Sequence, residues 1–331
     1  MLGITLQFKS RDFAEKIHSY IINEKKLDFP LRNIDFWNFK NGEMGAYVPE
    51  NVRKKRIYFI HDSTKEPSRW WVELLLVKDL LLSASAESVT FVLPNMLYSR
   101  QDRKDKPHVP ISARAFARSI SPGLERIITM ELHAPQLQGF YPENVPVDNL
   151  FAFPEVVRYL RANHYSYLNN LVVVSPDLGS AQRTRAFLSR LEKAQEKDGK
   201  KQEYFFAICN KERIKHGEVD NVELIVGDVE VRNVFFLDDM IDSGGTLCKA
   251  AETLKMRGAK KLLCYGTHAM FSDGTEKLLK TFDIVMTSNT HNKKYHGVET
   301  IDVSPIFAEA IYRAYVGESI SELFDTRTNK A

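Results

Sequence analysis

Short apolar runs alternate with amphipathic segments along most of the chain. Runs at 56–60, 89–93, 126–130, 171–174, 205–208, 234–237, 261–265 and 284–287 predict strands, and the run at 171–174 is made almost wholly of β-branched residues. Runs without internal polar alternation are typical of strands buried on both faces of a parallel sheet. Helices are predicted at 11–24, 70–83, 112–120, 181–196, 247–254, 274–281 and 304–316.

This alternation of strands and helices predicts α/β architecture with mainly parallel sheets. The pattern begins afresh after about residue 156, and a chain of 331 residues is comfortable for two domains. We therefore expect two domains, residues 1–155 and 156–331, each a mainly parallel sheet flanked by helices.

The richest strand–turn–helix pattern runs from Asn233 to Arg257. Its strand is expected to end on Asp238 and Asp239, and the Gly-rich loop at 242–246 leads into a helix whose Leu247, Ala250, Ala251 and Leu254 form one apolar stripe. Gly258 is the expected stop. The free N–H groups and dipole of a helix N-terminus favour an anion, and two aspartates suit sugar hydroxyls or a metal carried with a phosphate. A bare α/β turn with two solvated aspartates is the alternative.

Other polar segments follow predicted strands, where α/β sheets place their ligand sites. These segments are 98–105, 131–133 and 175–180. Residues 210–221 are polar and aperiodic, so we expect a mobile loop there.

Composition restricts the class of protein. A net charge of +3 is too small to indicate nucleic acid, and the odd count of 3 cysteines argues against a disulfide framework and for a reducing cytosol. The N-terminus lacks a signal-peptide core, and Glu73, Lys78 and Asp79 interrupt the most apolar stretch, so neither secretion nor a membrane span is expected.

Taken in order, the motifs resemble those of the ribose-phosphate pyrophosphokinase (PRPP synthetase) family, which has two type I phosphoribosyltransferase-like domains. The motifs lie at 39–43, 100–104, 110–113, 132–140, 175–177, 211–213 and 238–246, so the resemblance covers nearly the whole chain. It implies transfer of the β,γ-diphosphoryl group of ATP to the 1-hydroxyl of ribose 5-phosphate, which gives PRPP and AMP and uses Mg²⁺. It also implies a homo-oligomer, with dimers assembling to a hexamer, and no nucleic-acid or membrane partner.

The resemblance also implies roles for individual residues. The ATP-binding set is Phe39, Asn41, Glu43, Arg100 and Gln101, and the ribose-5-phosphate-binding set is Asp238, Asp239, Asp242, Ser243, Gly244, Gly245 and Thr246. The catalytic set is Lys211, Arg213 and His133, and the metal-binding set is Glu131, His133 and Asp177. Glu131 stands where the family usually has aspartate, which keeps the charge and adds a methylene.

The same residues could also have purely structural roles. Without the resemblance, Lys211 and Arg213 in a polar loop would be solvated surface, and Phe39 could lie in the core beneath a simple turn.

Two alternatives to the synthetase stay open. A PRPP-consuming phosphoribosyltransferase would share the loop at 242–246, but it should have one domain and lack the Arg100-Gln101-Asp102 motif. A non-catalytic regulatory paralogue should lose or interrupt the 211–213 motif, which is intact here.

Overall fold

The computed structural model describes residues 1–6, 11–61, 63, 66–196, 203–212, 221–291 and 293–324, with the main chain alone at 210–212 and 221–226. These residues form two compact units. Unit 1 comprises Met1–Phe151, Asn289–Lys293 and Val303–Phe324, whereas unit 2 comprises Ala152–Ser288 and Lys294–Asp302.

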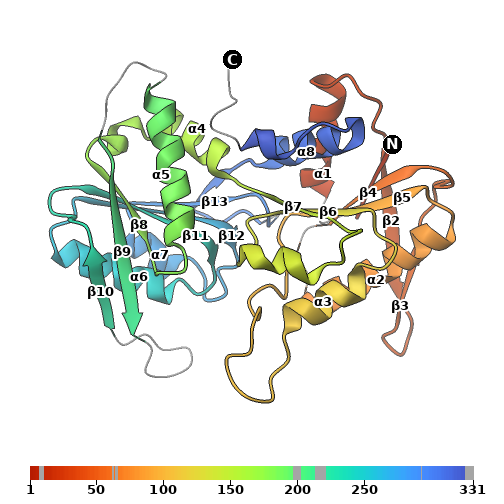
Figure 1. Cartoon of the computed structure of the whole chain (residues 1–331), viewed down its shortest axis with the longest axis horizontal. Helices are drawn as coiled ribbons and strands as arrows, with labels where there is room; N and C mark the ends of the chain where they lie inside the picture. Colours follow the sequence, from red (N-terminus) through yellow and green to blue (C-terminus); the bar gives the residue numbers. More distant parts are fainter. Residues whose placement is uncertain are drawn as a thin grey trace. The chain divides into compact units, whose positions relative to one another are not determined.

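Unit 1 is built on a seven-stranded sheet in the order β3-β2-β1-β4-β5-β6-β7. Its strands are β1 (Leu2–Leu6), β2 (Leu31–Asn38), β3 (Met44–Tyr47), β4 (Arg56–Ile60), β5 (Ser88–Leu93), β6 (Arg126–Met130) and β7 (Val147–Leu150). Neighbouring strands are parallel except in the β2–β3 hairpin. α1 (Arg11–Asn23) and α8 (Ser304–Val316) cover one face, and α2 (Pro67–Ser83) and α3 (Ser112–Ile120) cover the other (Figure 1).

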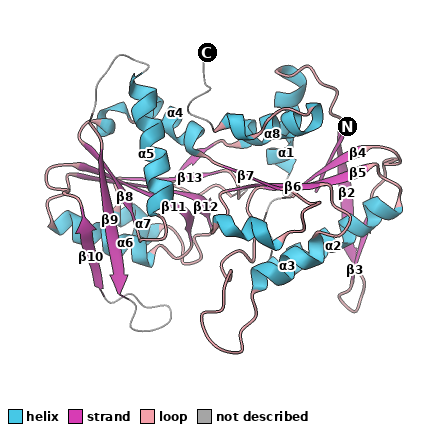
Figure 2. Cartoon of the chain, viewed as in Figure 1, coloured by secondary structure: helices cyan, strands magenta, loops and turns pink. Residues whose placement is uncertain are grey.

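Unit 2 repeats this arrangement, with the order β10-β9-β8-β11-β12-β13-β14. Its strands are β8 (Leu171–Ser175), β9 (Phe205–Glu212), β10 (Asn221–Val226), β11 (Asn233–Ile241), β12 (Lys261–Ala269), β13 (Ile284–Ser288) and β14 (Glu299–Ile301), and only β9–β10 is antiparallel. The helices α4 (Phe153–Asn163), α5 (Ala181–Glu196), α6 (Gly245–Met256) and α7 (Glu276–Thr281) flank this sheet (Figure 2). The predicted α/β class with two mainly parallel sheets is confirmed.

Burial explains why the apolar runs became central strands. All five residues of β8 are buried, as a parallel strand with helices on both sides requires. The predicted stripe of α6 is buried as well, and Gly258 has φ = +86°, the left-handed conformation of a residue that ends a helix.

Several elements differ from the prediction. β11 continues through Asp238 and Asp239 to Ile241, so both aspartates lie inside a strand instead of following it. The predicted mobile loop at 210–221 is wrong at its ends, because Lys211 pairs with Val222 and Asn210 with Glu223 across the β9–β10 hairpin. Asn210, Lys211 and Glu212 are polar, so the end of β9 has no apolar periodicity that would predict a strand. The sequence analysis did not predict β7 or α4.

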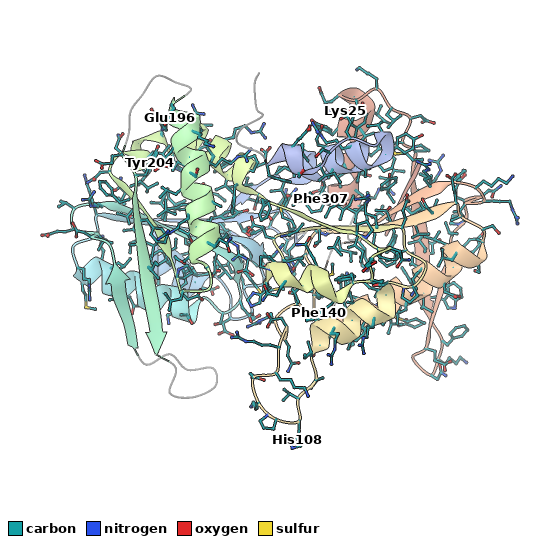
Figure 3. The ribbon with its side chains drawn as sticks, in the orientation of Figure 1. Lys25, His108, Phe140, Glu196, Tyr204 and Phe307 are labelled. Carbon is teal, nitrogen blue, oxygen red and sulfur yellow. The ribbon has the colours of Figure 1, made fainter. Side chains whose placement is uncertain are left out.

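The units also interleave along the sequence. The expected single boundary near residue 155 stays a prediction, but α8 belongs to unit 1 although it lies near the end of the chain. Phe307 of α8 packs edge-on against Phe13 of α1, with ring centroids 5.4 Å apart. Figure 3 labels Phe307 and Lys25, which lie on α8 and just after α1.

No helix in the described ranges is both long enough and apolar enough to cross a membrane. The side chains of Cys209, Cys248 and Cys264 are all buried.

Candidate active site

The paired aspartates of unit 2 lie near the carboxyl end of β11, close to Arg183. Arg183 Nη1 lies 2.7 Å from Asp239 Oδ1 and 3.9 Å from Asp238 Oδ1. The Asp239 side chain keeps 6% of its surface exposed, and that of Asp238 keeps 21%. The N–H of Asp239 donates to Asp238 Oδ1 at 3.0 Å, so both carboxylates are held by donors of the protein.

This arrangement raises the pKa of Asp238. Burial first, and then the neighbouring carboxylate of Asp239, raise the pKa of Asp238 well above its usual value, and Asp177 acts in the same direction. Arg183 opposes them. A ligand that donates hydroxyl hydrogens, or a cation, would favour the charged form of this carboxyl.

Asp177 lies in the loop between β8 and α5. Its Oδ1 accepts the N–H of Ser180 at 2.9 Å, and its carbonyl accepts the Ser175 hydroxyl at 2.6 Å. These bonds fix the loop and keep Asp177 within electrostatic range of Asp238.

The predicted phosphate loop forms a tight turn at the start of α6. Gly244 has φ = +72° and precedes the helix without a side-chain capping bond. A Cβ atom there would lie 3.0 Å from the Leu278 side chain, which would have to shift, so the positive φ favours glycine and the space adds to this preference. The Ser243 side chain is exposed, and Gly245 and Thr246 are half-buried.

The loop after β12 supports this turn. The N–H of Ser272 donates to the carbonyl of Asp242 at 3.2 Å, and its hydroxyl donates to Asp242 Oδ1. The N–H of Met270 donates to the carbonyl of Ile241 at 2.9 Å. The helix N-terminus is therefore presented on a fixed backbone, which suits binding of a phosphate.

In unit 1, the predicted ATP residues lie after β5. Arg100 is exposed, and Gln101 accepts a 2.5 Å hydrogen bond from the Ser112 hydroxyl at the start of α3. Gln136 donates to Asp102 at 3.2 Å, which ties this loop to the segment after β6. Figure 3 labels His108 at the tip of the same loop.

Glu131 and His133 follow β6 in unit 1. Glu131 is 2% exposed and has φ = +43°, a conformation that non-glycine residues rarely adopt. Its N–H donates to the carbonyl of Leu150 at 2.9 Å, whereas His133 is exposed. A strained backbone is thus retained at a predicted ligand position.

The predicted purine-binding residues occupy the turn of the β2–β3 hairpin. Phe39 is 53% exposed, so the alternative that it lies in the core is wrong. The N–H of Phe39 donates to the carbonyl of Glu43 at 2.7 Å, and Asn41 Oδ1 accepts the N–H of Glu43 at 3.2 Å. The exposed ring of Trp37 lies 6.1 Å from that of Phe39.

Of the predicted catalytic pair, Lys211 lies in β9, and only its main chain is described. Arg213 lies outside the described residues.

The donors present fit Mg²⁺ that arrives with a nucleotide. Within the described ranges, no group of three or more His, Cys, Asp or Glu side chains is arranged to hold a metal ion by itself. Mg²⁺ is commonly bound through one or two carboxylates together with substrate phosphates, so a full protein cage is not needed. Glu131 and His133 belong to unit 1 and Asp177 to unit 2.

Sequence analysis missed two residues of this region, Arg183 and Ser272. Both act on residues far along the chain, at Asp239 and Asp242. The only local signal was the place of Arg183 in the first turn of a helix that follows a strand-end loop.

Comparisons with known proteins agree with this geometry. Residues 4–122 match the model of the N-terminal domain of ribose phosphate pyrophosphokinase, and residues 214–325 match that of the phosphoribosyl synthetase-associated domain. The chain is 37% identical over 320 residues to ribose-phosphate pyrophosphokinase 4 of Saccharomyces cerevisiae, covering 95% of this chain and 91% of the relative. It is 39% identical over 305 residues to the ribose-phosphate pyrophosphokinase of Helicobacter pylori, covering 91% of each.

A solved structure extends this agreement to the fold. The phosphoribosylpyrophosphate synthetase from Mycobacterium smegmatis superposes with a TM-score of 0.81 at 27% identity, over 96% of this chain and 99% of that one. The chain described here belongs to the ribose-phosphate pyrophosphokinase family.

Proposed function

We propose that this chain is an active ribose-phosphate diphosphokinase that transfers the diphosphoryl group of ATP to the 1-hydroxyl of ribose 5-phosphate. One observation carries the proposal beyond family membership. In unit 2, the start of α6 has no carboxylate cap, and only a long 3.4 Å bond joins the N–H of Gly245 to the Ser243 hydroxyl. This helix start and the carboxylates of Asp238 and Asp239 together offer a phosphate and a diol their complementary groups.

The acceptor would bind in unit 2 through two kinds of contact. The first N–H groups of α6 and the hydroxyls of Ser243 and Thr246 donate to the 5-phosphate. Asp238 and Asp239 accept hydrogen bonds from the ribose hydroxyls, which orients the 1-hydroxyl. Gly244 and Gly245 let the backbone approach the phosphate, and Asp242 fixes the turn through Ser272.

The donor would bind to residues of unit 1. Arg100 and Gln101 hold the nucleotide, and the exposed ring of Phe39 stacks on the purine, with Asn41 and Glu43 as hydrogen-bonding partners. In the proposed homo-oligomer a neighbouring subunit supplies this hairpin, and dimers assemble to a hexamer.

In the reaction, the 1-hydroxyl oxygen attacks the β-phosphorus of ATP. The bond from that phosphorus to the oxygen bridging it to the α-phosphate breaks, AMP departs with that oxygen, and the hydroxyl proton passes to solvent. Lys211 and Arg213 stabilise the charge on the transferred group, and His133 contacts the phosphates. Bound Mg²⁺ would neutralise phosphate charge, with Glu131, His133 and Asp177 as its proposed protein partners, partly through water.

A coupled assay that follows AMP from ATP tests the activity. We expect AMP formation at millimolar Mg²⁺ that depends on ribose 5-phosphate. No AMP formation at all would exclude this function and favour the regulatory paralogue. AMP formation that does not depend on the sugar would also exclude it and would indicate hydrolysis of ATP. PRPP consumption with a free base would instead indicate a phosphoribosyltransferase.

A variant at the 211–213 motif separates catalysis from binding. Lys211→Ala should reduce turnover by about two to four orders of magnitude, because charge stabilisation is lost only in the transition state. The affinity for ribose 5-phosphate should be nearly unchanged. Lys277→Ala, which removes an exposed lysine of α7, is the matched control. Equal losses of turnover and sugar affinity in Lys211→Ala would mean that this residue is structural.

We also propose that the protein acts in the cytoplasm, without nucleic acid or membrane as a partner. Light scattering at several protein concentrations would test the oligomer, and a monomer that retains full activity would contradict the shared-subunit ATP site.

A further inference from the structure

Arg183 contacts the aspartate pair but belongs to neither proposed substrate-binding set. Its side chain is 14% exposed, and the guanidinium lies 2.7 Å from Asp239. A guanidinium withdrawn from solvent to this extent is costly to bury unless it is paired, so its partners determine where it lies.

Packing of α5 against β11 fixes the position of Arg183. Phe187, one helical turn further along α5, is fully buried, and its ring lies 5.4 Å from that of Phe235 in β11. Residues four apart share a helix face, so the contact that docks α5 on β11 also turns Arg183 toward the strand. Thr184 adds a 3.0 Å hydrogen bond from its hydroxyl to the carbonyl of Ser180, which ties the first turn of α5 to the Asp177 loop.

The bonds to Asp238 and Asp239 restrict how each carboxylate can rotate. Arg183 holds Oδ1 of Asp239, and the main chain of Asp239 holds Oδ1 of Asp238. Two adjacent carboxylates would otherwise repel each other and turn apart, since like charges at this range are destabilising. Arg183 therefore orients Asp239 through a hydrogen bond and acts on Asp238 through its charge, with Nη1 3.9 Å from Asp238 Oδ1.

We propose that Arg183 is the positioning residue of the acceptor site, which fixes Asp238 and Asp239 in the orientation that accepts the ribose hydroxyls. This inference rests on the proposed function, because it takes ribose 5-phosphate as the ligand of the pair. Arg183 acts through the two aspartates and does not itself contact the sugar.

The test compares three variants of the full-length chain. Arg183→Ala removes the guanidinium, and Arg183→Lys keeps the charge but loses the planar fork. Arg185→Ala is the matched control, because Arg185 lies two residues along the same helix, is exposed and stacks 5.0 Å from the Phe206 ring. Calorimetry measures binding of ribose 5-phosphate alone, the AMP assay gives both KM values, and thermal melting monitors folding.

We expect Arg183→Ala to weaken ribose 5-phosphate binding roughly ten- to hundredfold. This is the loss typical of one charge-assisted hydrogen bond, here one between a mispositioned aspartate and a ribose hydroxyl. Its KM for ATP should stay within about twofold, because only the acceptor is mispositioned. Arg183→Lys should recover part of the sugar affinity, and Arg185→Ala should match the wild type in every measurement.

Other results would overturn the inference. Sugar affinity in Arg183→Ala equal to that of Arg185→Ala would show that Arg183 positions nothing. Equal losses for ATP and for the sugar, with no recovery in Arg183→Lys, would indicate a purely structural arginine. If Arg183→Ala does not fold, Arg183→Lys decides alone, and unchanged sugar affinity in that folded variant would reject the role. A wild-type chain that makes no sugar-dependent AMP rejects the proposed function itself, which is a different result from any of these.

Discussion

The proposed role of Asp238 in binding the sugar opposes its effect on stability. Its pKa is raised by burial and by the neighbouring Asp239, so the folded chain binds this proton more tightly than the unfolded chain does. The free energy of unfolding therefore falls as the pH rises from about 4, the unfolded pKa of aspartate, through the raised folded value. Ionisation of Asp238 therefore lowers the free energy of unfolding, and a ligand that donates hydrogen bonds to the carboxylate would offset this loss.

Asp238→Asn should separate these two effects. Asparagine does not titrate, so we expect the unfolding midpoint at pH 8 to rise by about 2–4 °C, while binding of ribose 5-phosphate weakens about tenfold or more. Thermal melts between pH 4 and pH 8 and calorimetry check both.

The contrasting control for Asp238→Asn is Asp283→Asn. Burial of Asp283 opposes ionisation, but Lys261, 2.6 Å away, and the N–H of Leu262 outweigh it and lower the pKa of Asp283. That carboxylate contributes stability at high pH, so its replacement should lower the midpoint at pH 8. A lower midpoint for both variants would mean that Asp238 is not under like-charge strain.

The length of the Glu131 side chain can be tested by shortening it to aspartate. Aspartate tolerates the left-handed backbone at φ = +43° at least as well as glutamate, so Glu131→Asp should leave the unfolding midpoint within about 2 °C. The carboxylate moves back by one methylene, and we expect the KM for ATP and the Mg²⁺ requirement to rise about tenfold, with the KM for the sugar unchanged. Steady-state kinetics over a range of Mg²⁺ concentrations measures this. An unchanged KM for ATP would exclude Glu131 from the nucleotide and metal site.

At the scale of elements, the two sheets share one strand order, but equivalent helices begin differently. By that order β4 and α2 correspond to β11 and α6. At the start of α2, Glu66 accepts the N–H groups of Ser68 and Arg69 at 3.1 and 3.0 Å, so a protein carboxylate already occupies this helix terminus. Gly244 leaves the start of α6 without such a cap. The same topology thus leaves the start of α6 available for the proposed phosphate, whereas Glu66 occupies the start of α2.

Gly244→Ala tests the geometry of that open terminus. The positive φ and the contact with Leu278 at 3.0 Å predict a loss of about 1–3 kcal/mol of unfolding free energy and a large loss of sugar affinity. Gly245→Ala is the control for stability, since its nearest neighbour would be Ser243 Oγ at 3.7 Å. Chemical denaturation and calorimetry measure the two effects. Equal stability in both variants would contradict the structural requirement at Gly244.

Local sequence determined much of this element-level picture. Apolar runs located β4, β6 and β8 nearly to the residue, and helix periodicity located α5 and α8, because their burial is set by side chains close in sequence. The end of β9 was not predicted because Asn210, Lys211 and Glu212 are polar, and β10 was not predicted because its uninterrupted apolar run, 224–226, is only three residues long. Asp238 and Asp239 were found from a contiguous motif, whereas Arg183 was missed because its partner is 56 residues away.

At the scale of the whole molecule, α8 belongs to unit 1 although it lies near the end of the sequence. Besides the Phe13–Phe307 contact, Lys25, just after α1, pairs with Glu309 of α8 at 2.5 Å, which ties α8 to the end of α1. The stability of unit 1 should therefore depend on α8, which follows the described segments of unit 2 in the sequence. This dependence distinguishes the interleaved arrangement from two domains divided near residue 155.

Phe307→Ala puts this dependence to the test. The ring is fully buried, so its removal should cost about 3–5 kcal/mol, and the loss should appear where α8 packs. Hydrogen exchange of the full-length variant should show lost protection in α1, β1 and β4, with β8, β11 and β12 protected as in the wild type. Phe187→Ala is the mirror control, because Phe187 is equally buried in unit 2 and packs against Phe153 and Phe235. It should expose β8 and β11 and leave α1 protected. If Phe307→Ala loosens the strands of unit 2 first, the stability of α8 belongs with the C-terminal half and the linear division at residue 155 is the better description.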